Sequence, residues 1–168
     1  MTYHTTESFV VEQAIADTST TAKHRLGTVV RAYDSTYGEG EFIYLLGVAS
    51  TVVGSIVRWN ATTHQTALLT VANGKNKGVP VGIAMSANVA SQYGWYQISG
   101  NAVIKKTTVA VTPQVPIFIS ATDGRIKVLA SAGQQILGAQ TANLTTVVTT
   151  TSTVVVTLTR PHTQGQIT

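Results

Sequence analysis

The sequence predicts an all-β protein, an antiparallel β-barrel or β-sandwich with an extended N-terminal arm. The first observation is composition, because 28 Thr and 22 Val stand among 168 residues. Such β-branched side chains are stiff and suit a pleated sheet better than a helix. The second is a succession of ten or eleven short apolar segments separated by Gly, Pro and Asn, which is typical of a sandwich or barrel. The third is a 43% hydrophobic content, enough for one packed domain of this length.

Residues 1–25 differ from the rest of the chain and are predicted to form the arm. They are polar and Thr-rich, and they are interrupted by one apolar run, Phe9-Val10-Val11. A short helix over residues 7–16 and an extended strand both remain open for this segment. Because a basic region followed by an apolar one is missing at the N-terminus, we expect no signal peptide.

Residues 26–160 are predicted to form the domain, and the polar residues 161–168 a C-terminal tail. The expected strands are Gly27–Tyr33, Glu41–Val48, Ser55–Asn60, His64–Thr70, Pro80–Ser86, Gly94–Ile98, Asn101–Lys106, Val115–Ala121, Arg125–Ala130, Ile136–Ala142 and Thr153–Thr159.

Four local patterns sharpen these expectations. Glu41–Val48 is apolar at both odd and even positions, which favours a strand buried on both faces or lying in an interface. Asp123-Gly124 is the strongest short hairpin signal of the chain. Thr153–Thr159 alternates, with Val154, Val156 and Leu158 on one side. Residues 73–78 (NGKNKG) are expected to form a turn, because Asn and Gly dominate them.

Bulk charge argues against a nucleic-acid partner. The formal net charge is +4 and the pI is about 9.5, but the basic residues are scattered and the longest cluster is the pair Lys105-Lys106. Sequence-independent DNA binding needs more positive charge in one place. No apolar run approaches the length of a membrane span, so no membrane partner is expected either.

Catalytic and cofactor motifs are not expected to operate here. The chain has no Cys, which removes thiol chemistry and zinc fingers. The residues Asp34, Glu39 and Glu41 resemble a weak cation site, but an Asx-turn at Asp34 is the preferred interpretation. Gly38-Glu39-Gly40 lacks the third glycine and the helix of a dinucleotide site. We therefore predict no catalytic residues, no metal and no cofactor.

The aromatic residues Tyr93, Trp95 and Tyr96 stand within four positions of one another. They fit a barrel core, and they also fit a surface cluster that binds a sugar or a protein, since Tyr and Trp favour such anchors. Sequence alone leaves both interpretations open.

Two stretches give the chain a family resemblance. They are residues 26–55 (LGTVVRAYDSTYGEGEFIYLLGVASTVVGS) and residues 81–103 (VGIAMSANVASQYGWYQISGNAV). They resemble small structural proteins of tailed bacteriophages, similar in character to capsid decoration (cement) proteins. The resemblance covers residues 26–106 well and 107–160 loosely, and its motifs carry no chemistry.

The resemblance implies a non-enzymatic virion protein on the outer surface of the phage head, assembled in the host cytoplasm. The implied partners are the major capsid protein and the chain itself, commonly as a homotrimer, with no direct contact to nucleic acid or membrane. In this hypothesis the arm reaches onto the capsid, and Tyr3, Phe9, Val10 and Val11 are the candidate contact residues.

Composition agrees with this hypothesis, because only 11% of residues are charged and charge is depleted at the cores of interfaces. Two alternatives remain. One is a receptor- or carbohydrate-binding module of a phage fibre or tail, with Tyr93, Trp95 and Tyr96 lining the site. The other is a tail-tube or connector ring protein, which would also be rich in β-structure.

Overall fold

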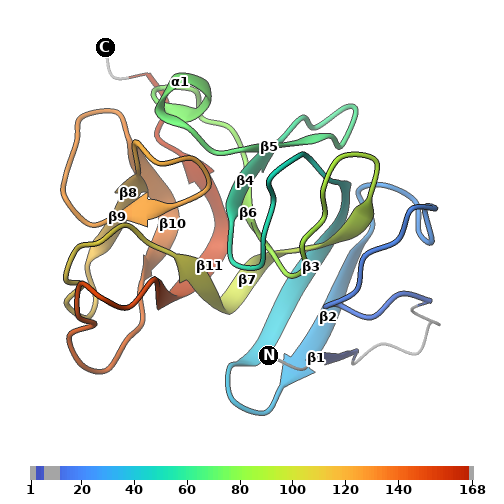
Figure 1. The fold of residues 1–168 in the computed structure, drawn as a ribbon, viewed down its shortest axis with the longest axis horizontal. Coiled ribbons are helices and arrows are strands. Elements are labelled where there is room, and N and C mark those ends of the chain that lie inside the picture. Colours follow the sequence, from blue (N-terminus) through green and yellow to red (C-terminus); the bar gives the residue numbers. More distant parts are fainter. Residues whose placement is uncertain (1–2, 6–11, 167–168) are drawn as a thin grey trace.

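The computed structural model describes residues 3–5 and 12–166, and its architecture is all-β, as predicted (Figure 1). A single helical turn, α1 (Val71–Gly74), accompanies the strands. The strands are β1 (Tyr3–Thr5), β2 (Val29–Asp34), β3 (Gly38–Leu46), β4 (Ile56–Trp59), β5 (Thr66–Leu68), β6 (Val81–Ala84), β7 (Tyr93–Lys105), β8 (Pro116–Ile119), β9 (Ile126–Lys127), β10 (Gln135–Thr141) and β11 (Thr153–Thr163).

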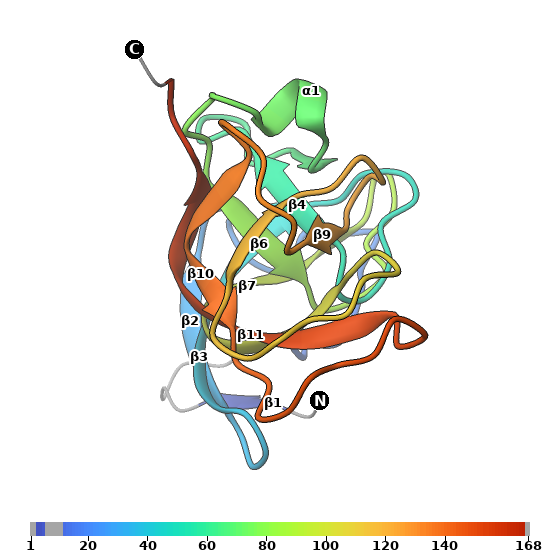
Figure 2. The same ribbon diagram turned by 90° about the vertical axis from the view of Figure 1, so that its left-hand side faces the viewer.

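The strands form one antiparallel sheet that curls into a half-barrel. Its main path runs β1-β2-β3-β7-β11-β10-β8-β9, and β6 attaches to β7 while β4 joins β6 to β5. Figures 1 and 2 show β8–β10 at one end of the curled sheet and β1–β3 at the other, with the small β4–β6 group beside β7. Every strand pair is antiparallel.

β7 is the strand that joins the two ends, and it is longer than predicted. Two strands were expected, with a break near Gly100, but one strand runs from Tyr93 to Lys105. Gly100 has φ +87°, and a Cβ there would lie 2.2 Å from the carbonyl oxygen of Glu39. Glycine therefore bends the strand without ending it. The first half of β7 pairs with β3 and β6, and the second half pairs with β11.

β3 is buried on both faces, which confirms one of the two interpretations of its apolar pattern. Phe42 and Tyr44 belong to one core cluster, together with Trp95. Ile43 and Leu45 belong to a second cluster on the opposite face. Because side chains alternate along a strand, one strand supplies both clusters.

The other end of the half-barrel has a purely aliphatic core. Its buried residues are Ile56, Leu69, Val81, Ile83, Ala102, Ile104, Val111, Ile117, Ile119, Ile126, Ile136, Val154, Val156 and Leu158. The predicted alternation of the last strand is confirmed, because Val154, Val156 and Leu158 face this core. The hairpin at Asp123-Gly124 is also confirmed, since β8 and β9 pair across it.

Two boundaries differ from expectation. The first two residues of the predicted 73–78 turn belong to α1, which Thr70 caps: its Oγ1 accepts from the Asn73 N–H, and its own N–H donates to Asn73 Oδ1. The strand β11 continues through Pro161 to Thr163, where the expected tail had already begun. The Thr163 N–H donates to the Val79 carbonyl at 2.9 Å, which holds the strand end in place.

Candidate functional site

The candidate aromatic cluster lies in the core and not on the surface. Trp95 and Tyr96 are fully buried, and Tyr93 is half-buried. The β7 pleat sends Trp95 and Tyr96 to opposite faces, so each ring enters a different core cluster. Burial raises the pKa of Tyr96 to about 12. The interpretation of these residues as a surface site for a sugar is therefore wrong.

A buried glutamine organises the polar atoms of the aromatic core. Gln13 Oε1 accepts a 2.6 Å hydrogen bond from the Tyr44 hydroxyl, and its Nε2 donates to the carbonyls of Asp17 and Tyr93 at 2.9 Å. Its own carbonyl accepts from Trp95 Nε1 at 3.0 Å. Gln13 thus fastens the segment before β2 to two strands of the sheet.

The described part of the predicted arm packs against the body of the protein. Ile15 is only 3% exposed and belongs to the same cluster as Trp95. The Lys23 N–H donates to the Tyr44 hydroxyl, and Ser19 forms a β-bridge with Tyr93. Residues 12–25 therefore line the aromatic core, so any free arm is confined to the residues before them.

The candidate contact residues of the arm occupy two different places. Tyr3 lies in β1, which pairs with β2 in the register Tyr3 to Asp34. This strand addition to the edge of the sheet occurs within the chain itself. Phe9, Val10 and Val11 lie outside the described residues, so their role stays a prediction.

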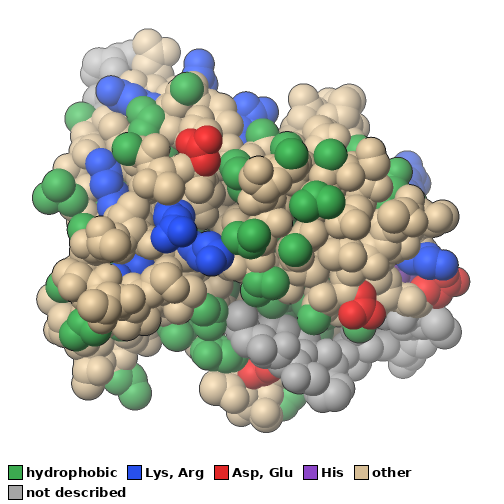
Figure 3. All heavy atoms as spheres, viewed as in Figure 1, with side chains coloured by type: hydrophobic (Ala, Val, Ile, Leu, Met, Phe, Trp, Pro, Cys, Tyr) green, Lys and Arg blue, Asp and Glu red, His purple; other side chains and the backbone are tan. Residues whose placement is uncertain are grey.

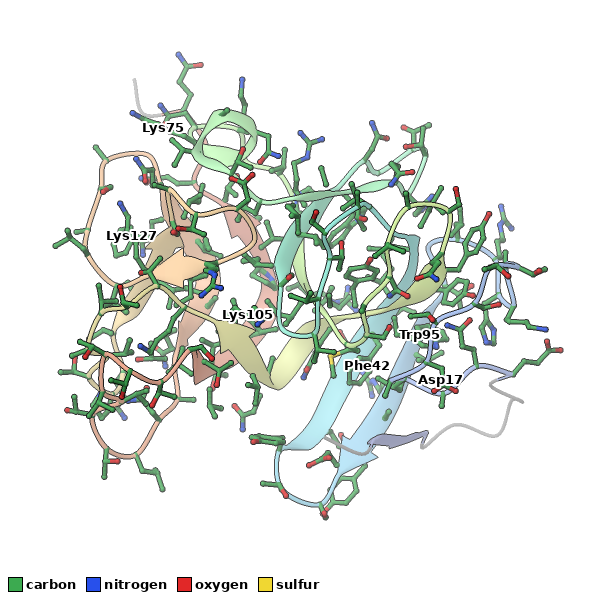
Figure 4. All side chains as sticks on the ribbon, in the orientation of Figure 1. Asp17, Phe42, Lys75, Trp95, Lys105 and Lys127 are labelled. Carbon is green, nitrogen blue, oxygen red and sulfur yellow. The ribbon has the colours of Figure 1, made fainter. Side chains whose placement is uncertain are left out.

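A buried lysine closes the aliphatic end (Figure 4 labels its neighbour Lys105). Lys106 is fully buried, and its Nζ donates to the carbonyls of Thr107, Val109 and Val148 at 3.3, 2.8 and 3.1 Å. Burial lowers the pKa of this ammonium group. Three acceptors satisfy its three donors, which connects the β7–β8 loop to the β10–β11 loop.

The surface near the bend in β7 carries an ion-pair network around Glu41. Arg160 Nε donates to Glu41 Oε2 at 3.0 Å, and Arg31 approaches Glu41 Oε1 at 3.5 Å. The hydrogen bond from Arg160 is the main cause that lowers the pKa of Glu41, and the charges of both arginines add to it. Asp34 instead forms the predicted Asx-turn, accepting from the N–H groups of Thr36 and Tyr37. Asp34 and Glu41, two of the three acids of the weak cation motif, thus bind different groups.

Large apolar side chains are exposed on the loops. At the aliphatic end, Leu129, Leu144 and Val148 are 71%, 97% and 57% exposed. On the face seen in Figure 3, hydrophobic side chains gather over the β3–β4 and β6–β7 loops. Val52, Val53 and Val89 are the exposed members there, and the two loops adjoin through the Gly47 N–H and the Gln92 carbonyl. We call Val52, Val53 and Val89 the valine patch.

Sequence reasoning missed Gln13, Lys106 and the valine patch. A Gln in a polar N-terminal segment carries no signal of burial, and Lys106 looked like half of a surface pair. Val52-Val53 between two glycines was the one available signal, since a pair of adjacent valines in a loop cannot both follow the alternation of a sheet.

No protein-family model matches the chain, and no curated protein matches it. Within residues 3–5 and 12–166, no group of three or more His, Asp or Glu side chains could hold a metal ion. No helix in the described part is long and apolar enough to cross a membrane.

Proposed function

We propose that this chain is a structural decoration protein of a tailed-phage head, which binds the outer surface of the capsid and stabilises the lattice of the major capsid protein. The observation that carries the proposal is a surface with little charge and exposed apolar loops. Only 18 of the 168 residues are charged, and Asp34 and Lys106 among them are buried, so an accessible surface of 8037 Å² carries little charge, while designed soluble surfaces carry roughly 25–35% charged residues.

The exposed apolar residues lie on loops of different parts of the half-barrel. Leu144 lies in the β10–β11 loop of the aliphatic end with 97% of its surface exposed, and the valine patch lies on the β3–β4 and β6–β7 loops. Single exposed apolar residues are ordinary on protein surfaces. Apolar groups gathered on adjoining loops, in a chain this poor in charge, support protein contacts on more than one side.

The interior supports a bracing role. β7 runs through both ends of the sheet, and each end is fastened by a buried hydrogen-bonded side chain, Gln13 or Lys106. A structure in which both ends share one strand transmits load through main-chain hydrogen bonds. Homotrimer formation and placement at three-fold positions of the head belong to the same proposal.

The burial of Trp95 and Tyr96 removes the main support for a carbohydrate-binding module. A tail-tube or connector ring protein has no observation in its favour and is treated as an outcome of the test below.

The test is reconstitution with heads assembled from the cognate major capsid protein. The purified protein is mixed with heads that lack it, and the heads are sedimented. The proposal predicts saturable binding and a higher temperature for rupture of the heads. Absence of co-sedimentation, or binding only to tails, would contradict it.

The role of the arm is tested by substitutions and not by a deletion. Removing residues 2–20 would also remove Gln13 and Ile15, which pack in the core. Replacing Phe9, Val10 and Val11 with serine keeps Gln13 and Ile15 in the chain. If these residues contact the capsid, the triple variant binds heads more weakly while its unfolding midpoint stays unchanged. Unchanged binding by the triple variant would remove them from the contact.

A further inference from the structure

A shallow depression of about 820 Å³ lies beside the valine patch and is not used by any feature described above. Its lining includes Val52, Ser55, Lys105, Asp123 and Arg125. Figure 3 shows Lys and Arg side chains next to the gathered hydrophobic groups on this face, and Figure 4 places Lys105 in its middle. The depression therefore combines two cations with an apolar rim.

Three segments that are distant in sequence form the floor of the depression. The Lys105 N–H donates to the Gly54 carbonyl at 2.9 Å, and the Ile56 N–H donates to the Gly124 carbonyl at 3.1 Å. Gly54 and Gly124 have φ +80° and +66°, values that favour glycine. These hydrogen bonds hold the β3–β4 loop against β7 and the β8–β9 turn against the start of β4, so main-chain hydrogen bonds fix the backbone beside Lys105 and Arg125.

The two cations have no carboxylate partner among the described residues. Lys105 and Arg125 are both half-buried, and no acid of the described chain lies within 4.0 Å of either. Arg125 NH1 donates to the Lys106 carbonyl at 3.2 Å, which orients the guanidinium and leaves its other N–H groups for a ligand. An oriented guanidinium suits a carboxylate, because it donates two parallel hydrogen bonds.

We propose that this depression binds an acidic segment of a partner protein. Arg125 and Lys105 take its carboxylates, and Val52 takes an adjacent apolar side chain. The choice of the major capsid protein as the source of that segment rests on the proposed function, but the site itself does not. A nucleic acid fits less well, because only two cations are present, and the acidic Asp123 and the apolar Val52 line the same depression.

The test uses the full chain and a hexaglutamate peptide as the probe. We expect the peptide to shift the amide resonances of residues 52–55, 105 and 124–125. The variant K105Q/R125Q should lose about tenfold in affinity, as expected when a charge pair with hydrogen bonds is removed. The matched control is K75Q/K77Q, which makes the same change in net charge on and after α1 and should bind as the wild type does (Figure 4).

The variant Asp123→Asn distinguishes an effect on peptide recognition from damage to the fold. It removes a repulsive carboxylate from the rim, so it should tighten peptide binding, an effect that a misfolded loop would not produce.

Equal affinity of K105Q/R125Q and K75Q/K77Q, or tighter binding of an oligonucleotide with the same charge than of the peptide, would overturn the site. If Lys105→Gln alone weakens peptide binding while head binding is unchanged, the site stands and its assigned partner is wrong. If neither the wild type nor any variant binds heads but the wild type still binds the peptide, the proposed function fails and the site stands.

Discussion

The two ends of the half-barrel differ in the side chains of their cores and in the buried polar group that holds each end together. The aliphatic end packs only Ile, Val, Leu and Ala, and the polar groups of its loops converge on one ammonium group, that of Lys106. The aromatic end packs Phe42, Tyr44 and Trp95, and its polar atoms converge on the amide of Gln13. Each end has a buried polar side chain, Lys106 or Gln13, that fastens segments distant in the sequence.

Lys106 and Gln13 differ in the groups to which they bond. Lys106 bonds only to main-chain carbonyls of two loops, and beyond those loops Leu144 and Val148 are exposed. Gln13 bonds to the side chains of the sheet itself and covers the aromatic core with residues 12–25. The aliphatic end therefore presents fixed apolar loops to the outside, while the aromatic end is closed over. In the proposed function, the loops of the aliphatic end meet neighbouring subunits, as the valine patch does.

The strongest test of this comparison acts at the strand that joins the ends. Gly100→Ala places a Cβ 2.2 Å from the Glu39 carbonyl oxygen at φ +87°. We expect a loss of about 4 kcal/mol in the free energy of unfolding, from backbone strain and overpacking together. Chemical denaturation measures it. The control is Gly38→Ala, which has φ +78° but open space around its Cβ and should cost about 1 kcal/mol. Equal costs would show that β7 is not constrained at its bend.

Removing the buried ammonium should weaken the aliphatic end next most strongly. Lys106→Met keeps the length of the side chain but removes three hydrogen bonds to main-chain carbonyls, of which those of Thr107 and Val148 still accept a main-chain N–H, so a loss of about 3 kcal/mol is expected. Urea unfolding measures it, and the neighbour substitution Lys105→Met should stay within about 0.5 kcal/mol of the wild type. A neutral Lys106→Met would mean that the ammonium group does not hold the loops.

Gln13→Ala tests the aromatic end by the same logic. It removes the acceptor of the Tyr44 hydroxyl and one of the two donors to the Tyr93 carbonyl, while the N–H groups of Lys23 and Ser19 still donate to these two oxygens, at a cost of about 2 kcal/mol. Hydrogen exchange should rise at residues 14–23 and not in the β10–β11 loop, because the two ends are fastened independently. The exposed Gln166→Ala serves as control. Faster exchange at both ends would contradict that independence.

The smallest expected effect is the pH dependence of the ion pairs at the bend. The pKa of Glu41 is lower in the folded chain than its usual 4.5, so its stabilisation is present above that value and disappears as the pH falls through the folded pKa. Between about pH 5 and pH 2 the wild type should lose more stability than Glu41→Gln. Thermal unfolding across this range measures it, with Glu39→Gln as the control. Parallel curves for wild type and Glu41→Gln would show that the exposed arginines contribute nothing.

Strands could be predicted from the sequence, but the buried side chains that hold the two ends together, Gln13 and Lys106, could not. Alternation placed Val154, Val156 and Leu158 on one face, and Asp123-Gly124 located a hairpin, because both signals are local. Sequence reasoning divided β7 at Gly100, since glycine looks the same in a turn and in a bent strand. It could not place Gln13 or Lys106, because their burial depends on segments about 80 and 40 positions away. The valine patch became visible only when the two loops were seen side by side.

The most direct test of the central claim is a density map of the assembled particle. The account predicts density for this chain on the outer surface of the head, at three-fold or quasi-three-fold positions, with the aliphatic-end loops and the valine patch in contact with neighbouring subunits. Density in a six-fold ring at the tail, or a particle without this chain, would contradict it.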